Sequence, residues 1–319
     1  MELKDSFGRK IDYIRLSVTD RCNLRCIYCA PGGASRCLST SKPGNSISLE
    51  KVTRFLRVAK KYGLKKVRIT GGEPLLRKDI VRLVREIKAV GIEDLGLTTN
   101  GHLLPFFAEE LKEAGLDRVN ISLDSLRPEV YRELTGGGSL SAALRAVSVA
   151  EGVFGPAPVK INMVPIKGIN GDEIPDFARM TLEKPFHVRF IELMPVGMIT
   201  FEGLRITATE AKQAISRHFE LTSIGRTGSA DNYRLSGAKG VAGFISPISG
   251  HFCDSCNRLR ITAAGKIRSC LFSSCEEDLN TASTEKELEQ LLLLSVSRKE
   301  KGSLLNKAVQ FETMQQVGG

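Results

Sequence analysis

The sequence predicts an α/β protein: a partial (βα)6 TIM-type barrel, open on one side, followed by a C-terminal α+β extension. Two observations predict this fold class. Short β-branched runs alternate with helical stretches from residue 13 to about residue 194, which is typical of parallel βα units. One face of successive strands is polar, although parallel strands that are covered by helices are normally apolar on both faces. The polar face therefore indicates the lining of an open barrel.

The six expected strands cover residues 13–19, 65–70, 94–99, 118–123, 159–164 and 187–193. Between them lie amphipathic helices such as 79–90, where apolar residues recur at helical spacing. In the first strand Arg15 and Ser17 share one face while Leu16 and Val18 share the other, and three later strands alternate in the same way. A complete eight-stranded barrel fills its interior with apolar side chains, whereas six strands leave room for a polar ligand. The alternative is a sheet with one solvated face.

Composition narrows the class of protein and its partners. The chain has 319 residues, a formal charge of +10 and no Trp. We expect a barrel domain over residues 1–195 and an extension over 196–319. Because there is no signal peptide or membrane span, we expect a cytoplasmic protein that does not bind membranes. The basic excess suits an anionic partner, but the basic stretches lack the interleaved aromatics of single-strand binders, so nucleic acid is disfavoured.

Eight cysteines form two groups, and a reducing compartment favours metal ligation over disulfides. The groups are Cys22, Cys26, Cys29 and Cys37, and Cys253, Cys256, Cys270 and Cys275. The first three follow an apolar strand at the spacing C-x3-C-x2-C. A four-iron cluster normally takes four thiolates, so three leave one iron open to a chelating molecule. The cysteines alone also allow a zinc site with Cys37 as fourth ligand, and a zinc ribbon that includes Cys275.

A glycine-rich turn follows the second expected strand. In Thr70–Pro74, Gly71 and Gly72 allow backbone to approach a ligand closely, and the Glu73 carboxylate could hold a cationic group. This turn and the cysteine motif both follow barrel strands, at the end where active sites gather. Together they indicate a cofactor site.

At this point the chain resembles radical S-adenosylmethionine (SAM) enzymes, and more closely the GTP 3′,8-cyclase family of molybdenum cofactor biosynthesis. The resemblance covers nearly the whole chain. It rests on residues 15–23, 68–74, 189–195 and 253–260 with Cys270, and on the terminal Gly318-Gly319.

The resemblance implies two [4Fe-4S] clusters and SAM as cofactors. The first cluster would be held by Cys22, Cys26 and Cys29, and the second by Cys253, Cys256 and Cys270. The SAM pocket would contain Tyr28, Gly71, Gly72, Glu73, Ser122 and Met194. The GTP site would contain Arg15, Arg68, Thr99, Lys160, Arg258 and Arg260, with Lys66 and Arg189 as neighbours. The terminal Gly-Gly tail would reach toward the active site.

The implied activity is radical cyclisation of GTP to 3′,8-cyclo-7,8-dihydro-GTP, in which the first three cysteines, Arg258 and Arg260 carry the catalytic roles. Implied partners are an electron donor, the downstream cyclic pyranopterin monophosphate synthase and, for the oligomeric state, a second copy in a homodimer. Two alternatives stay open at this point. One is a radical SAM enzyme that uses its auxiliary cluster on a peptide or RNA, and the other is a non-catalytic zinc protein that binds nucleic acid.

Overall fold

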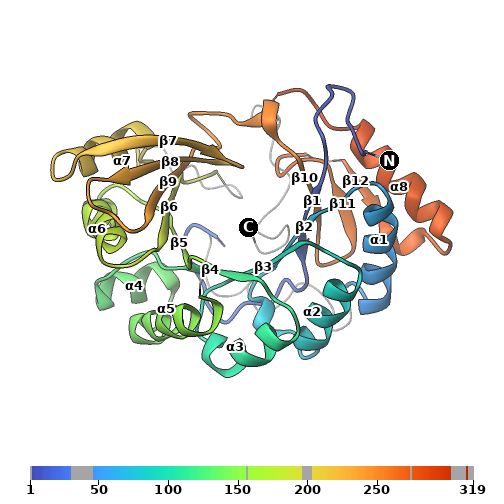
Figure 1. Cartoon of the computed structure of the whole chain (residues 1–319), viewed down its shortest axis with the longest axis horizontal. Coiled ribbons are helices and arrows are strands. Elements are labelled where there is room, and N and C mark those ends of the chain that lie inside the picture. The colour runs from blue at the N-terminus through green and yellow to red at the C-terminus, as the bar shows by residue number, and fades with distance from the viewer. Residues whose placement is uncertain are drawn as a thin grey trace.

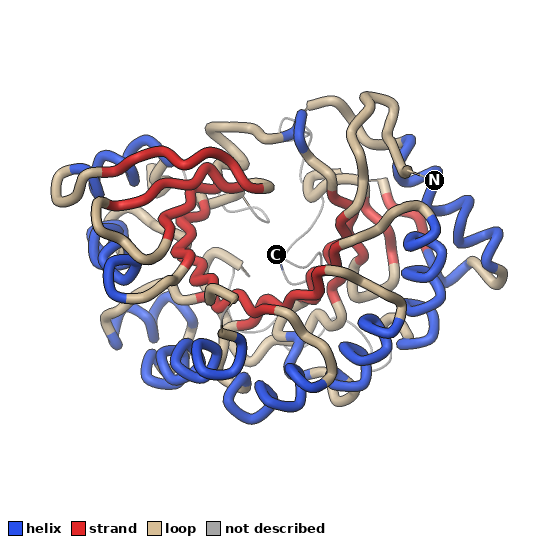
Figure 2. The backbone as a smooth tube through the Cα atoms, viewed as in Figure 1, coloured by secondary structure: helices blue, strands red, loops and turns tan. Residues whose placement is uncertain are grey.

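The structure, a computed structural model, describes residues 2–29, 46–155, 157–195, 203–273, 275–302 and residue 314. Its named strands form one 12-stranded sheet in the order β12-β11-β10-β1-β2-β3-β4-β5-β6-β9-β8-β7. The sheet curves around a central opening, and helices cover its outer side (Figures 1 and 2). The predicted fold class, a partial barrel with a C-terminal extension, is confirmed.

Six parallel strands form the middle of the sheet. They are β1 (Tyr13–Ser17), β2 (Lys66–Thr70), β3 (Asp94–Thr99), β4 (Arg118–Ser122), β5 (Lys160–Met163) and β6 (His187–Ile191). Each pairs in parallel with the next. Every observed strand lies within its predicted range. Several predicted strands are one or two residues too long at their ends. Side-chain alternation continues there beyond the last hydrogen bonds between neighbouring strands.

Helices on the outer side cover the apolar face of these strands. They are α1 (Leu49–Lys61), α2 (Ile80–Ala89), α3 (Leu104–Glu113), α4 (Pro128–Thr135), α5 (Leu140–Phe154) and α6 (Ile174–Glu183), with short turns η1 (Pro74–Leu76) and η2 (Gly171–Glu173). α1 begins where the Ser48 side chain accepts a hydrogen bond from the Lys51 amide, and it buries Val52, Phe55 and Leu56. The main core lies between these helices and the sheet.

The alternation of faces along the strands decides which side chains point inward. Leu16 and Ile69 are fully buried in the helix-covered core, whereas Arg15, Arg68 and Thr70 line the central cavity. The polar face is therefore the concave, inner face of the sheet, which lines a cavity, and the alternative of a sheet with one solvated face is excluded.

The C-terminal residues extend both edges of this sheet. On one edge lie β10 (Arg258–Ile261), β11 (Lys266–Arg268) and β12 (Glu276–Asp278), and on the other lie β9 (Val241–Ile245), β8 (Ala230–Leu235) and β7 (Leu221–Thr227). β10 is parallel to β1, and β9 is parallel to β6. The expected division at residue 195 stays a prediction, since strands from both sides of it share one sheet.

The remaining elements are α7 (Ala208–Ser216), α8 (Glu285–Ser297) and the short turns η3 (Cys253–Ser255) and η4 (Leu279–Thr281). α8 packs against α1 and follows β12. Among the described residues, no helix has both the length and the apolar character needed to cross a bilayer.

Candidate active site

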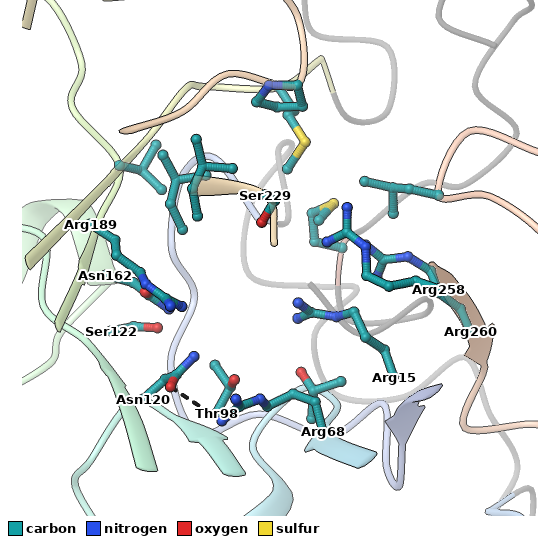
Figure 3. Close-up of a pocket in the computed structure, with 18 of the residues that line it drawn as sticks. Arg15, Arg68, Thr98, Asn120, Ser122, Asn162, Arg189, Ser229, Arg258 and Arg260 are labelled. Atoms are coloured by element: carbon teal, nitrogen blue, oxygen red, sulfur yellow. Dashed lines mark hydrogen bonds between the residues drawn. The ribbon is translucent and has the colours of Figure 1, made fainter. Parts of the chain in front are cut away.

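A cavity of about 460 Å³ occupies the inside of the curved sheet. Its walls come from β1 to β6 and β10, and from the loops that follow these strands. Figure 3 shows polar side chains that converge on this space, with Arg189 on one side and Arg15, Arg258 and Arg260 on the other. Both groups of cysteines named below open into the same cavity.

Cys22, Cys26 and Cys29 lie in the loop after β1 and line the cavity. The loop is fastened to the end of α4, because the Arg25 amide donates to the Thr135 carbonyl at 2.8 Å and the Ile27 amide to Leu134 at 3.0 Å. Burial raises the pKa of the Cys26 thiol well above its usual value, and the neighbouring Asp124, Cys29 and Cys22 raise it further. Three mutually close thiols at a cavity wall fit the three-cysteine set of a site-differentiated cluster, in which iron would hold them deprotonated.

Gly71 and Gly72 let the turn after β2 press against the cysteine loop. The Gly72 amide donates to the Thr19 carbonyl, and the Glu73 amide to the Arg21 carbonyl, each at 2.7 Å. A Cβ on Gly72 would lie 2.2 Å from the Arg21 carbonyl oxygen, and one on Gly71 would lie 2.4 Å from that of Thr19. These are contacts with backbone, so no side chain can be accommodated without moving the cysteine loop.

We therefore expect Gly72→Ala to displace the loop that holds the first three cysteines. Overpacking costs on the order of 1–3 kcal/mol, and here the strain falls on the loop itself. The variant should lose iron and unfold at lower temperature, as measured by iron assay and thermal unfolding under anaerobic conditions. Gly152→Ala is the matched control, because Gly152 lies on α5 with nothing within 4 Å of its added Cβ. Full iron occupancy in the Gly72 variant would contradict this reading of the turn.

Glu73 lies behind the cavity wall, where sequence reasoning did not expect it. It is fully buried and is absent from the cavity lining. Its carboxylate accepts hydrogen bonds from the Thr99 hydroxyl at 2.8 Å, the Asn100 amide at 2.8 Å and the Leu75 amide at 3.1 Å. Burial raises the pKa of Glu73 to about 7, although these three donors lower it. In this position the carboxylate fixes Thr99, which does line the cavity, and a role of Glu73 toward the cofactor stays a prediction.

Tyr28, Ser122 and Met194 line the same cavity as the first cysteine group, and Met194 packs with Cys29. The Tyr28 hydroxyl donates to Asp124 at 2.6 Å, and the other oxygen of Asp124 accepts from the Val164 amide. Burial raises the pKa of Asp124 to about 6. Asp124 therefore orients Tyr28, a role that sequence reasoning missed although the residue comes two positions after Ser122.

Met314 also contacts this end of the cavity. Its amide donates to the Cys29 carbonyl at 3.0 Å, and its side chain packs with Cys29, Met194 and Leu271. The Gly318-Gly319 tail, Cys37 and residues 196–202 lie outside the described residues.

Cys253, Cys256 and Cys270 line the same cavity, whereas Cys275 is exposed and is not part of its wall. Cys256 lies two residues before β10, and Cys270 lies two residues after β11. Burial would raise the pKa of the Cys256 thiol, but the charges of Arg258 and Lys299 outweigh burial and lower it to about 7. A thiol so readily ionised is suited to ligate iron.

Within the described ranges, no three His, Cys, Asp or Glu residues are arranged around a single metal ion. A zinc site gathers its ligands around one ion. A [4Fe-4S] cluster is bound instead through separate irons, so its thiolates are spread around a larger body. Each three-cysteine set in the cavity wall supplies three thiols, the number that leaves one iron of such a cluster open.

Eight cationic side chains line the cavity, against only two carboxylates, Asp124 and Glu192, among the described residues. The cations are Arg15, Lys66, Arg68, Arg118, Lys160, Arg189, Arg258 and Arg260. The strand register sets Arg15 beside both Arg68 and Arg260. Several parallel strands thus present positive charge to one space.

Burial and mutual repulsion perturb these groups strongly. Burial, with the charges of Arg189, Arg118 and Arg68, lowers the pKa of Lys160 to about 6. The pKa of Arg189 is lowered to about 10 for the same reasons, and that of Arg260 falls well below its usual value. Buried like charges are unfavourable unless an anion compensates them. The cavity is therefore built for a highly charged anionic ligand.

Tyr13 and Arg118 are cavity residues that sequence reasoning missed. Both lie on the inner face, since Tyr13 is two residues before Arg15 and Arg118 two residues before Asn120. Although burial would raise it, the charges of Arg68, Arg15 and Arg258 lower the pKa of the Tyr13 phenol to about 7. The two-residue period of the strand could have identified both.

Glycine makes space for one of the arginines. The Arg68 guanidinium donates to the Asn120 side chain at 3.2 Å, the contact that is dashed in Figure 3. A Cβ on Gly96 of the adjacent strand would lie 2.2 Å from the Arg68 guanidinium. Gly96 thus leaves the room in which Arg68 turns toward the cavity.

Comparison with known proteins agrees with this site. Residues 16–181 match the Radical SAM superfamily, and residues 186–305 match the family described as Molybdenum Cofactor Synthesis C. The GTP 3′,8-cyclase of Moorella thermoacetica is 43% identical over 99% of this chain and 100% of its own length. The GTP 3′,8-cyclase of Heliobacterium modesticaldum is 49% identical over 87% of this chain and 86% of its own.

Solved structures show the same fold at low identity. The crystal structure of Streptococcus suis SuiB has a TM-score of 0.67 and 16% identity, covering 96% of this chain and 77% of that one. SuiB bound to S-adenosylmethionine has a TM-score of 0.66 and 16% identity, covering 88% and 66%. This likeness concerns the fold, whereas the sequence matches extend over almost the whole chain. The chain belongs to the GTP 3′,8-cyclase family of the radical SAM superfamily.

Proposed function

We propose that this protein cyclises GTP to 3′,8-cyclo-7,8-dihydro-GTP, the first step of molybdenum cofactor biosynthesis. One observation carries the proposal: two sets of three cysteines and eight cationic side chains line the same cavity. The family uses SAM and two [4Fe-4S] clusters. In our assignment Cys22, Cys26 and Cys29 hold the first cluster, and Cys253, Cys256 and Cys270 hold the second.

When bound by Cys22, Cys26 and Cys29, the first cluster would supply, together with SAM, the one-electron reductive chemistry that starts hydrogen abstraction. We assign Tyr28, the Gly71-Gly72 backbone, Ser122 and Met194, which line the same cavity as Cys22, Cys26 and Cys29, to SAM. The protein contributes position and exclusion of water, since a primary carbon radical would attack any other hydrogen donor within reach.

Loss of the ribose 3′ hydrogen and closure of the C3′–C8 bond leave a guanine-centred radical that requires one electron and one proton. Arg258 and Arg260 stand beside the second cysteine set and share one strand face, so we assign them to the substrate. Arg15, Arg68, Thr99 and Lys160 complete the assigned GTP site. Guanidinium groups match phosphate oxygens bidentately, and a triphosphate compensates the charge that burial makes costly.

The test is anaerobic incubation of the iron-loaded protein with SAM, a strong reductant and one nucleotide at a time. We expect GTP and SAM to be consumed together, with cyclised GTP and 5′-deoxyadenosine formed, and ATP to remain intact. A radical SAM enzyme for peptide or RNA would cleave SAM without consuming GTP, and that outcome would overturn the proposal.

We expect Lys160 to take up a proton when GTP binds. Its pKa of about 6 without ligand means that the amine is largely neutral near pH 7. A bound triphosphate should return this pKa toward its ordinary value, so GTP binding takes up as much as one proton. Because the free protein then holds fewer protons than the complex, GTP affinity should fall as pH rises above about 6, by up to about tenfold per pH unit. Calorimetry in two buffers of different protonation enthalpy measures the uptake.

Lys160→Met should abolish this proton uptake while leaving weaker GTP binding. A binding enthalpy that is independent of the buffer in the unsubstituted protein would contradict the prediction.

We further propose the partners that this chemistry requires. The reaction consumes electrons, so a protein electron donor must reach the first cluster, and the cyclised product is passed to cyclic pyranopterin monophosphate synthase. A homodimer stays a prediction, which sedimentation of the iron-loaded protein would test.

A further inference from the structure

The chain segment that follows α8 contacts the second cysteine set at Cys256 and beside Cys270, and it reaches Cys253 through Arg9. Lys299 is 5% exposed, and its ammonium donates to the Arg258 carbonyl at 2.9 Å and to the Ser269 carbonyl at 2.8 Å. Its third neighbour is the Cys256 sulfur at 4.0 Å. An ammonium has three N–H donors, and here three acceptors surround it. Two of them are backbone carbonyls, one two residues after Cys256 and the other directly before Cys270.

Arg9 completes the contacts from the other side. Its guanidinium donates to the Cys253 carbonyl and to the Glu300 carbonyl, each at 2.7 Å. Asp5, whose side chain has no exposed surface, holds Arg9 at 2.6 Å. Through Arg9 and Lys299, residues 299–300 are tied to the backbone at or beside each of the three cysteines.

We propose that Lys299 is a positioning residue of the second cluster: it fixes the Cys256 and Cys270 segments and places a positive charge at the Cys256 sulfur that favours the reduced cluster. The inference rests on the proposed function, because it takes Cys253, Cys256 and Cys270 as the ligands of that cluster. It adds a residue that lies about thirty positions beyond the last of them and outside every cysteine motif.

The physical argument concerns the charge and hydrogen bonds around a ligand sulfur. Reduction adds one negative charge to a cluster, so a fixed cation near a ligand thiolate stabilises the reduced form more than the oxidised one. The interaction is strong because Lys299 is buried, where solvent screens charges poorly. Arg258 also approaches Cys256, but it is a substrate residue in our assignment, whereas the Lys299 ammonium contacts two backbone carbonyls and the Cys256 sulfur among the described residues.

The experiment compares Lys299→Met, Lys299→Arg and Lys301→Met in the iron-loaded protein. Lys299→Met keeps the length of the side chain and removes its charge and donors. Lys301→Met removes an exposed charge two residues away and is the matched control. The readouts are iron content and a redox titration followed by electron paramagnetic resonance, in which added SAM identifies the first cluster.

We expect Lys299→Met to shift the reduction equilibrium of the second cluster about tenfold toward the oxidised form, about 59 mV for one electron, or to lose that cluster selectively. The first cluster should keep its potential, and Lys299→Arg should retain most of the unsubstituted value. Unchanged potentials and full iron in Lys299→Met would overturn the inference. Loss of both clusters together with the thermal unfolding transition would also overturn it, because Lys299 would then serve the whole fold.

Cys256→Ala separates this inference from the assignment beneath it. If Cys256→Ala keeps full iron, the ligand assignment in the proposed function fails. If Cys256→Ala loses about half of the iron while Lys299→Met matches the Lys301→Met control, only the role of Lys299 fails.

Discussion

Replacing Cys29 with alanine should reduce formation of 5′-deoxyadenosine to background. Cys29 lines the cavity in the loop after β1, where its carbonyl also receives the Met314 amide. Loss of one of only three thiolates leaves an incomplete first cluster, and the chemistry that the cluster supplies cannot start. The measurement is 5′-deoxyadenosine by liquid chromatography, with iron assay on the same sample.

Cys275→Ala is the control for this variant, because Cys275 is exposed and lies outside the cavity wall. It should keep full iron and full SAM cleavage. The Cys29 variant should keep about half of its iron, since the second cysteine set is intact. If Cys29→Ala still cleaves SAM, the assignment of the first cluster to Cys22, Cys26 and Cys29 is wrong.

Substituting Arg258 or Arg260 with alanine should impair GTP turnover, whereas the first cluster and the capacity to cleave SAM should be retained. Both residues lie on β10, Arg260 is 9% exposed, and the Arg258 guanidinium lies 4.9 Å from the Phe252 ring centre. A hydrogen bond to a charged group contributes about 1.5–3 kcal/mol. Each substitution should therefore lower GTP turnover roughly 10- to 100-fold at fixed substrate concentration.

The measurement is GTP consumption and 5′-deoxyadenosine formation in parallel, so that uncoupled SAM cleavage becomes visible. Iron content must be compared, because Arg258 also lowers the pKa of Cys256. Arg217→Ala removes an exposed arginine at the end of α7 and should match the unsubstituted protein. Normal GTP turnover in both cavity variants would exclude Arg258 and Arg260 from the substrate site.

The inner strands could be predicted because the alternation of side chains along a strand can be read from neighbouring residues in the sequence. Alternation with period two placed Arg15, Arg68 and Lys160 on one face, and the cavity lining contains all three. The same period also placed Tyr13 and Arg118 there, but both stand at the first position of their strands, where only the following residues show the alternation. The sequence pattern thus predicted the charged inner face of the sheet but not all of the residues on it.

Features that depend on distant contacts could not be predicted from local patterns. Glu73 follows a turn that faces the cavity, yet three donors from elsewhere draw its carboxylate into the core. The positions of β9 and β10 on opposite sides of the six central strands are decided by tertiary pairing with β6 and β1. Arg9 and Lys299 contact the second cysteine set from the two ends of the described chain, and their sequence surroundings give no metal signal.

The most direct test of the central claim follows one hydrogen atom. The two cysteine sets and the cationic wall should hold GTP so that its ribose C3′ is the hydrogen donor for SAM-derived chemistry. GTP that carries deuterium at C3′ should therefore yield 5′-deoxyadenosine heavier by one mass unit, and GTP deuterated at C8 should not. Unlabelled 5′-deoxyadenosine from the C3′-deuterated substrate, formed while GTP is consumed, would contradict the account.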